Sequence, residues 1–239
     1  MKKKLLIGGC SFSEPKHGHG PWHPWTDQFV KEYKDEWDVT NTSQGSIGNA
    51  IITQNIVDNI LKGDRPDLVI VQWSAIGRAY SHNETDFIGR LLKEKNALQF
   101  APHMGEYISQ DDRAGWVTNM VDTISDNFYQ SSLVSMIGLQ SFLNEKQIPY
   151  IFFWGWCQFN DDLRTKFRYY LDLLYNERWW NPTGSMSSFI QRKYGKKGIM
   201  GGGDFHPNNL GQRHFYEKAV KPWFEDDRLL EPFVPNQIK

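Results

Sequence analysis

The sequence has few cysteines, no excess of charge of either sign and no long apolar run. Its two cysteines, Cys10 and Cys157, are too few for a disulfide framework, and free buried thiols fit a reducing compartment. The 27 Lys and Arg residues nearly balance the 28 Asp and Glu residues, so no basic surface indicates a nucleic-acid partner. Because no stretch approaches the length of a transmembrane helix, no membrane partner is expected either.

The amino terminus begins like a secretory signal, with lysines followed by apolar residues. The apolar run is too short for such a signal and breaks at Gly8 and Gly9. We therefore expect a cytoplasmic protein, or one that is packaged into a virion without secretory export. The 239 residues suit a single domain over 1–239, with insertions around 79–114 and 178–198.

Aromatic residues are abundant, with 10 Trp, 10 Tyr and 15 Phe. Packing in the core accounts for most of them, and Trp25 is expected there. Trp179 and Trp180 stand in an irregular stretch, where they could instead line a lid or a platform for a sugar ring.

Short apolar runs alternate with runs of helical spacing along the whole chain. This alternation predicts a three-layer α/β/α sandwich with a central parallel sheet, of the flavodoxin-like type. The expected strands are 4–9, 37–43, 67–74, 148–156 and a short fifth one within 198–205. The expected helices are 26–37 with Thr26 as N-cap, 48–61, 116–147, 161–177 and 207–224, while 179–189 is expected to be a loop.

Reactive side chains follow the predicted strands, and the carboxyl ends of parallel strands are where such sheets bind ligands. The first strand is followed by Cys10, Ser11 and Ser13, and the last candidate strand leads to Asp204 and His206. A hydroxyl, an imidazole base and an orienting carboxylate are the parts of a serine hydrolase. The residue types leave Cys10, Ser11 and Ser13 open as the nucleophile. Because alternate residues at a strand end point to opposite faces, Cys10 is expected to be a buried neighbour of Ser11, and Ser13 is expected to be a turn or helix cap.

The motifs resemble those of the SGNH, or GDSL-type, hydrolase family. Residues 9–11 stand where that family has its Gly-Asp-Ser nucleophile motif, with Cys10 in place of Asp, and 202–212 resemble its last block, with His206 as base. Within 41–49, Gly45, or otherwise Gly48, would supply an oxyanion N–H group. The resemblance implies an α/β/α sandwich that hydrolyses acetylated sugars, lipids or simple esters without a metal or organic cofactor.

Two positions depart from the family pattern. The family places its Asp three residues before the His, where this chain has Gly203, so either Asp204 or a backbone carbonyl orients the imidazole. The family's Asn after the third strand falls near Ile76. Other donors that could replace it are Ser74, Gln72 and Arg78.

The leading hypothesis is a serine hydrolase acting on an ester, with the aromatic richness favouring a carbohydrate ester. The catalytic residues are Ser11 as nucleophile, His206 as base and Asp204 as the residue that orients the base. The expected oxyanion donors are Ser11, Gly45 and Ser74. The expected substrate contacts are Asn49, Arg78 and Trp180.

Alternatives come from other classes of protein. A non-catalytic SGNH-like protein could bind a glycan or belong to a virion, and an enzyme could use the Cys10 thiol instead of Ser11. The loop histidines His17, His19 and His23 are ligand types that zinc accepts, but no carboxylate or cysteine motif accompanies them, so no metal is expected. The sequence leaves the oligomeric state open.

Overall fold

The computed structural model describes most of the chain in separate ranges. These are residues 2–15, 23–45, 47–63, 65–76, 110–156, 161–175, 177–181, 184–199 and 206–226, with the side chains of 110–156 described from 126 onward except at 128.

The described residues form a sheet of four parallel strands in the order β2-β1-β3-β4. The strands are β1 (Lys3–Gly9), β2 (Trp37–Asn41), β3 (Leu68–Trp73) and β4 (Tyr150–Trp154). Every residue of β3 and β4 is buried, which is why both read as unbroken apolar runs in a sheet covered on both faces.

The predicted fifth strand is not part of this sheet in the described ranges. Ile199 makes only an isolated antiparallel bridge to Pro207, and residues 200–205 lie outside the described residues. A single bridge does not extend a parallel sheet, so that prediction is wrong for its described part.

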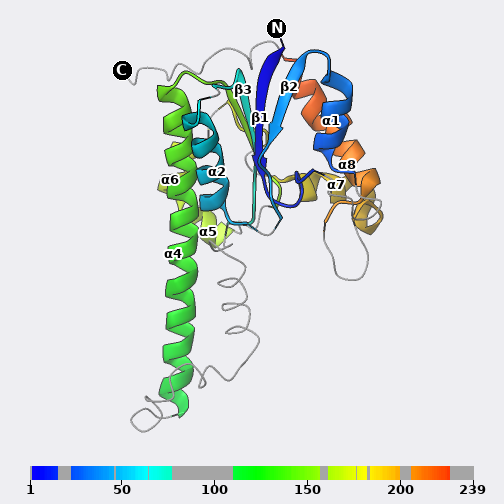
Figure 1. Cartoon of the computed structure of the whole chain (residues 1–239). Coiled ribbons are helices and arrows are strands. Elements are labelled where there is room, and N and C mark those ends of the chain that lie inside the picture. The colour runs from blue at the N-terminus through cyan, green and yellow to red at the C-terminus, as the bar shows by residue number, and fades with distance from the viewer. Residues whose placement is uncertain are drawn as a thin grey trace.

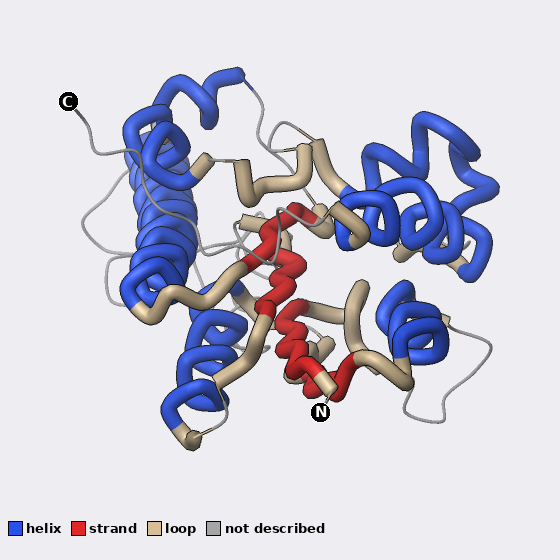
Figure 2. Tube along the Cα trace, turned by 90° about the horizontal axis from the view of Figure 1, so that it is seen from above, coloured by secondary structure: helices blue, strands red, loops and turns tan. Residues whose placement is uncertain are grey.

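Helices cover both faces of the sheet, as Figure 2 shows from above. One face carries α2 (Asn49–Leu61), α4 (Gln110–Glu145), α5 (Asp161–Lys166) and α6 (Arg168–Leu174). The other carries α1 (Trp25–Tyr33), α7 (Met186–Tyr194) with the 3-10 turn Gly195–Gly198, α8 (Asn209–Phe215), the π-helical turn Tyr216–Val220 and α9 (Lys221–Phe224). The predicted three-layer α/β/α sandwich is confirmed.

Three local predictions are wrong. Thr26 does not cap the first helix: Pro24 occupies the N-cap, and the Thr26 hydroxyl lies inside the helix and donates to Ser13 O. The helix expected over 161–177 is broken at the buried Phe167, whose backbone leaves the helical region. The loop expected over 179–189 contains the start of α7.

A capping box explains the start of α7. The Ser185 side chain accepts from Ser188 N, and the Ser188 side chain accepts from Ser185 N. Two backbone donors of the first turn are thereby satisfied, which favours a helix where sequence composition alone indicated a loop.

Helix α4 is the longest element and begins earlier than predicted, at Gln110, inside the expected insertion over 79–114. Its 36 residues span about 54 Å, more than twice the length of any strand here. Figure 1 shows that α4 extends past the carboxyl ends of the strands. The rest of the expected insertion, up to residue 109, lies outside the described residues.

The carboxy-terminal helix expected over 207–224 is present but changes pitch along its length. Asn208 caps α8, because its side chain accepts from Gly211 N. Pro222, in the first turn of α9, has no N–H to donate and its ring crowds the preceding turn. The π-helical turn between α8 and α9 accommodates this proline.

Aromatic side chains fill the core, as the composition predicted. Trp25, Trp73 and Trp154 are fully buried. Trp179 is also buried, against Trp154 and Phe152, so it belongs to the core and does not line a lid. No helix in the described ranges is long and apolar enough to span a membrane.

Candidate active site

Ser11 and His206 meet at the carboxyl edge of the sheet, although 195 positions separate them in the sequence. Strand β1 ends at Gly9, and a turn closed by Ser13 N donating to Cys10 O at 3.0 Å presents Ser11. The Ser11 Oγ lies 2.7 Å from His206 Nε2, which is hydrogen-bond distance. A serine hydroxyl can transfer its proton to an imidazole at this separation.

The imidazole is held from the side by Phe12. The two rings meet edge to face with centroids 4.9 Å apart, and Phe12 in turn contacts the half-buried Trp156 after β4. Immediately after the imidazole, Asn208 donates to the carbonyl oxygens of Lys197 and Ile199. The ring itself is contacted by Phe12, and the Asn208 bonds hold the backbone segment that follows it.

A buried glutamine on β3 holds the Ser11 turn by accepting hydrogen bonds from the residues on either side of Ser11 and Phe12. Gln72 Oε1 accepts from Cys10 N at 3.2 Å and from Ser13 Oγ at 3.3 Å, while its Nε2 donates to Trp73 O. Gln72 is fully buried next to the carboxyl end of an otherwise apolar strand. Such a residue costs stability unless its amide is fully paired, so its place under the turn is specific.

Ser13 is the centre of a second set of contacts. Its hydroxyl accepts from Trp25 Nε1 at 2.8 Å, and its carbonyl oxygen accepts from Asn41 Nδ2 at 2.9 Å. Gln212 on α8 accepts from Trp25 N and donates to Phe12 O. The predicted turn role of Ser13 is correct, and its buried hydroxyl also links the turn to α1.

Cys10 is buried next to Ser11, as predicted. Its sulfur lies 3.4 Å from Gln72 Oε1 and 3.3 Å from Gln72 Nε2. A thiol nucleophile needs a base that generates the thiolate, and a carboxamide does not provide one. The contacts therefore favour Ser11 over Cys10.

Gly45 lies beside Ser11, where the hypothesis requires an oxyanion donor. A Cβ built on Gly45 would lie 3.8 Å from Ser11 Cβ and 2.8 Å from Glu14 Oε2. The space beside the Gly45 backbone is therefore bounded by the Glu14 carboxylate and the Ser11 side chain, and a side chain at position 45 would require Glu14 to move. Gly48, the second candidate, is the N-cap of α2 and its carbonyl oxygen accepts from Ile52 N.

The exit of β3 carries the predicted donor Ser74. Its N–H group donates to Asn49 Oδ1 at 2.8 Å, so this N–H is already engaged. The Ser74 hydroxyl and Asn49 Nδ2 are buried and have no hydrogen-bond partner among the described residues. Ile76, at the position of the family's Asn, is buried at 1% exposure and offers no side-chain donor.

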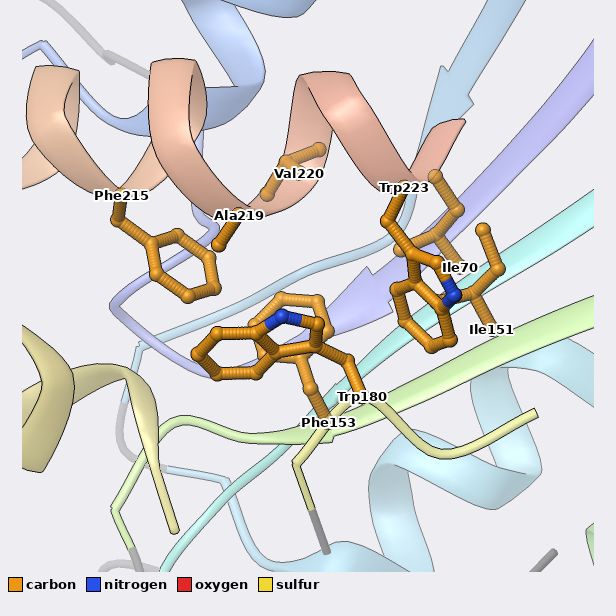
Figure 3. Close-up of a pocket in the computed structure, with 8 residues that line it drawn as sticks. All are labelled: Ile70, Ile151, Phe153, Trp180, Phe215, Ala219, Val220 and Trp223. Atoms are coloured by element: carbon orange, nitrogen blue, oxygen red, sulfur yellow. The ribbon is translucent and has the colours of Figure 1, made fainter. Parts of the chain in front are cut away.

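Trp180, predicted to contact substrate, packs among aromatic side chains on one face of the sheet. Its ring meets Phe153, Phe189 and Phe215, and Figure 3 shows it lining a small apolar pocket with Trp223. None of these partners is Ser11 or His206. A substrate contact by Trp180 stays a prediction.

Other predicted positions lie outside the described residues: Asp204, Arg78, Cys157, His17 and His19. Of the loop histidines, His23 is described, and its backbone N–H donates to Asn209 Oδ1. No group of three or more His, Cys, Asp or Glu side chains that could hold a metal occurs within the described ranges.

Three residues at this edge were missed by the sequence interpretation: Glu14, Trp156 and Gln212. Gln72 was named there as a possible oxyanion donor, whereas the structure places it under the Ser11 turn, where it accepts from Cys10 N and Ser13 Oγ. Gln72 had a usable signal, because a lone carboxamide in an apolar strand must find buried partners. Glu14 and Trp156 stand next to turns and Gln212 lies within α8, and nothing in these residue types alone singled them out.

Comparison with known proteins identifies the type of sandwich. No family profile matches the chain, and no curated protein matches it. Among solved structures, the crystal structure of TesA is similar over 93% of this chain and 98% of that chain, with a TM-score of 0.53 and 15% sequence identity. At this identity the likeness shows the fold, so the sandwich of this chain has the same fold as TesA.

Proposed function

We propose that this protein is an ester hydrolase in which Ser11 is the nucleophile and His206 is the general base. The observation that carries the proposal is the 2.7 Å separation of Ser11 Oγ and His206 Nε2 at the carboxyl edge of an SGNH-type sheet. Both residues stand at the positions that resemble the catalytic pair of the SGNH motifs, and their short separation supports the proposal.

In the first half-reaction, Ser11 Oγ attacks the ester carbonyl carbon while its proton passes to His206 Nε2. Negative charge develops on the carbonyl oxygen. The backbone N–H groups of Ser11 and Gly45 are the proposed donors to that oxyanion. When the tetrahedral intermediate collapses, His206 returns the proton to the departing alcohol and Ser11 carries the acyl group.

In the second half-reaction, His206 accepts a proton from water, which attacks the acyl carbon and releases the carboxylic acid. Ser11 recovers its proton from His206 at the end of the cycle. Asp204, two residues before His206, is the proposed orienter of the imidazole. The contact of Phe12 with the ring supports the same orientation from the side.

Turnover of p-nitrophenyl acetate tests the proposal. Ser11→Ala and His206→Ala should each lower kcat/KM by at least about 1,000-fold. Ser135→Ala is the matched control, because the Ser135 hydroxyl bonds only to its own helix, at Ser131 O on α4, and its loss should leave turnover unchanged. Equal turnover by the wild type and by a folded Ser11→Ala variant contradicts the assignment.

One observation favours a second candidate, a non-catalytic protein that binds a glycan or belongs to a larger assembly. The position of the family's Asn donor is occupied by the buried Ile76, and the Ser74 N–H is engaged by Asn49. An oxyanion site with fewer donors loses about 100-fold or more in rate for each one. A folded protein that binds an acetylated oligosaccharide without hydrolysing it would favour this candidate.

A further inference from the structure

The carboxylate of Glu14 lies beside Gly45 and Ser11 in the candidate active site. An ideal Cβ built on Gly45 would lie 2.8 Å from Glu14 Oε2 and 3.8 Å from Ser11 Cβ. The Glu14 and Ser11 side chains are therefore neighbours on the same side of the Gly45 backbone. The Glu14 carboxylate is therefore close enough to Ser11 to meet a group that a bound ester carries next to its scissile bond.

Nothing in the described residues neutralises this carboxylate. Glu14 is half-buried, yet no lysine, arginine or histidine of the described ranges forms an ion pair with it, and no hydrogen bond there engages it. A partly desolvated carboxylate without a partner is unfavourable, and a bound cation would relieve that cost. Its placement beside a reactive serine points to a substrate group as that partner.

Aromatic side chains near the imidazole add to the same preference. Phe12 contacts the His206 ring, and the half-buried Trp156 contacts Phe12. The faces of such rings attract cations, and quaternary ammonium groups in particular. Phe12 is itself buried, so the aromatic surface next to the site is that of Trp156. The charge of Glu14 and this aromatic surface both disfavour an anionic substrate.

We propose that Glu14 makes this site selective for esters that carry a positive charge near the scissile bond, such as esters of an amino alcohol, over neutral and anionic esters. The inference rests on the proposed hydrolase function and specifies its substrate class. Glu14 acts on the charge of the bound substrate, so it is a specificity-determining residue and takes no part in proton transfer.

Hydrolysis of two esters of the same shape measures this selectivity. Acetylcholine carries a quaternary nitrogen, and neohexyl acetate has a carbon in its place. The wild type should favour acetylcholine by about 10-fold in kcat/KM, and the preference should shrink as salt is added. Glu14→Gln should bring the ratio close to unity, because it keeps the shape of the side chain and removes the charge.

Asp35→Asn is the matched control. Asp35 is an exposed carboxylate in the turn before β2, at the opposite edge of the sheet, so its loss changes the net charge equally but should leave the ratio intact. A wild type without preference, or a Glu14→Gln variant that keeps it, overturns the inference. If Ser11→Ala hydrolyses both esters at the wild-type rate, the proposed hydrolase function is wrong instead.

A second readout covers the case in which both esters are turned over too slowly to compare. Two fluorophosphonate probes, one ending in a trimethylammonium group and one in a tert-butyl group, replace the esters. Ser11 should react faster with the cationic probe in the wild type and equally with both in Glu14→Gln. Equal labelling rates in the wild type contradict the inference, whatever the ester activity.

Discussion

At the scale of single residues, the Ser11 turn depends on one buried carboxamide. Gln72 accepts hydrogen bonds from Cys10 N and Ser13 Oγ, and the backbone between those two residues carries Ser11. If Gln72 is lost, buried donors of the turn have no acceptor. Loss of Gln72 would therefore displace the Ser11 hydroxyl by shifting the backbone of the turn, since Gln72 bonds to Cys10 and Ser13 and not to Ser11 itself.

Gln72→Leu should lower the free energy of unfolding by about 1–3 kcal/mol and slow the modification of Ser11. Gln140→Leu is the control, because Gln140 is also buried but donates only to Leu173 O, while its Oε1 has no partner among the described residues. Its replacement should cost less than about 1 kcal/mol and leave Ser11 reactivity unchanged. Urea unfolding and fluorophosphonate labelling rates measure both effects, and equal losses in the two variants contradict this role for Gln72.

The sequence predicted the residues that form motifs and missed those that support them. Ser11 and His206 were named because a strand exit and a His-Pro pair before a helix can be recognised in the sequence alone. The structure brings the two side chains together. Gln72 was named only as a possible oxyanion donor and Glu14 was not named, because strand register and turn geometry are what place both of them near Ser11. Their partners are distant or depend on side-chain direction, which sequence spacing does not encode.

At the scale of elements, α8 must approach the 3-10 turn Gly195–Gly198 closely. A Cβ on Gly211 would lie 2.3 Å from the backbone oxygen of Gly198. The same oxygen accepts from Asn208 N, two residues after His206. A side chain at position 211 would therefore push α8 and the segment that carries the imidazole away from the sheet.

Gly211→Ala should lower the free energy of unfolding by about 1–3 kcal/mol and also reduce ester hydrolysis. Gly138→Ala is the matched helical control, since a Cβ at this exposed position in α4 meets no atom within 4 Å. It should stabilise the protein by about 0.5–1 kcal/mol. Thermal unfolding distinguishes the two, and a Gly211→Ala variant as stable as the wild type would contradict the close approach.

Elements that depend on periodicity were predicted well, and those that depend on local hydrogen bonds were not. The apolar run of β3 and the helical spacing of α2 are present close to their expected bounds. The start of α7 depends on the reciprocal bonds of Ser185 and Ser188, and the break between α5 and α6 depends on Phe167 turning into the core. Neither feature changes the hydrophobic pattern.

At the scale of the whole molecule, α1 is joined to the carboxy-terminal helices by charged and phenolic groups. Lys221 and Tyr216 donate to the Glu32 carboxylate, and Tyr33 donates to Glu225. The hydrogen bonds from Lys221 and then Tyr216 hold the pKa of Glu32 below its ordinary value. The charged form of Glu32 is therefore favoured in the folded state.

A lowered folded pKa means that Glu32 contributes stability above the ordinary carboxyl pKa and loses it as the pH falls through the folded value. The wild type should be more stable than Glu32→Gln at about pH 7, and the difference should narrow towards about pH 3. Urea unfolding of both proteins at the two pH values checks this. A difference that grows in acid contradicts the assignment.

The sandwich itself was predictable because alternating buried strands and amphipathic helices admit few other arrangements. The likeness to TesA at 15% identity indicates how little of the sequence this fold requires. Catalysis is decided by a few side chains at one edge, where this chain departs from the SGNH pattern at Cys10 and Ile76. The fold therefore follows from the sequence more directly than the reaction does.

Labelling with a fluorophosphonate, followed by peptide mapping, tests the central claim that Ser11 is an activated nucleophile. The account predicts one labelled site per chain, at Ser11, with labelling lost in Ser11→Ala and slowed at least about 100-fold in His206→Ala. Ser13 serves as an internal control, because its hydroxyl is buried between Trp25 and Gln72 and should stay unmodified. A folded wild-type protein that takes up no label at Ser11, or that is labelled equally without His206, would contradict the account.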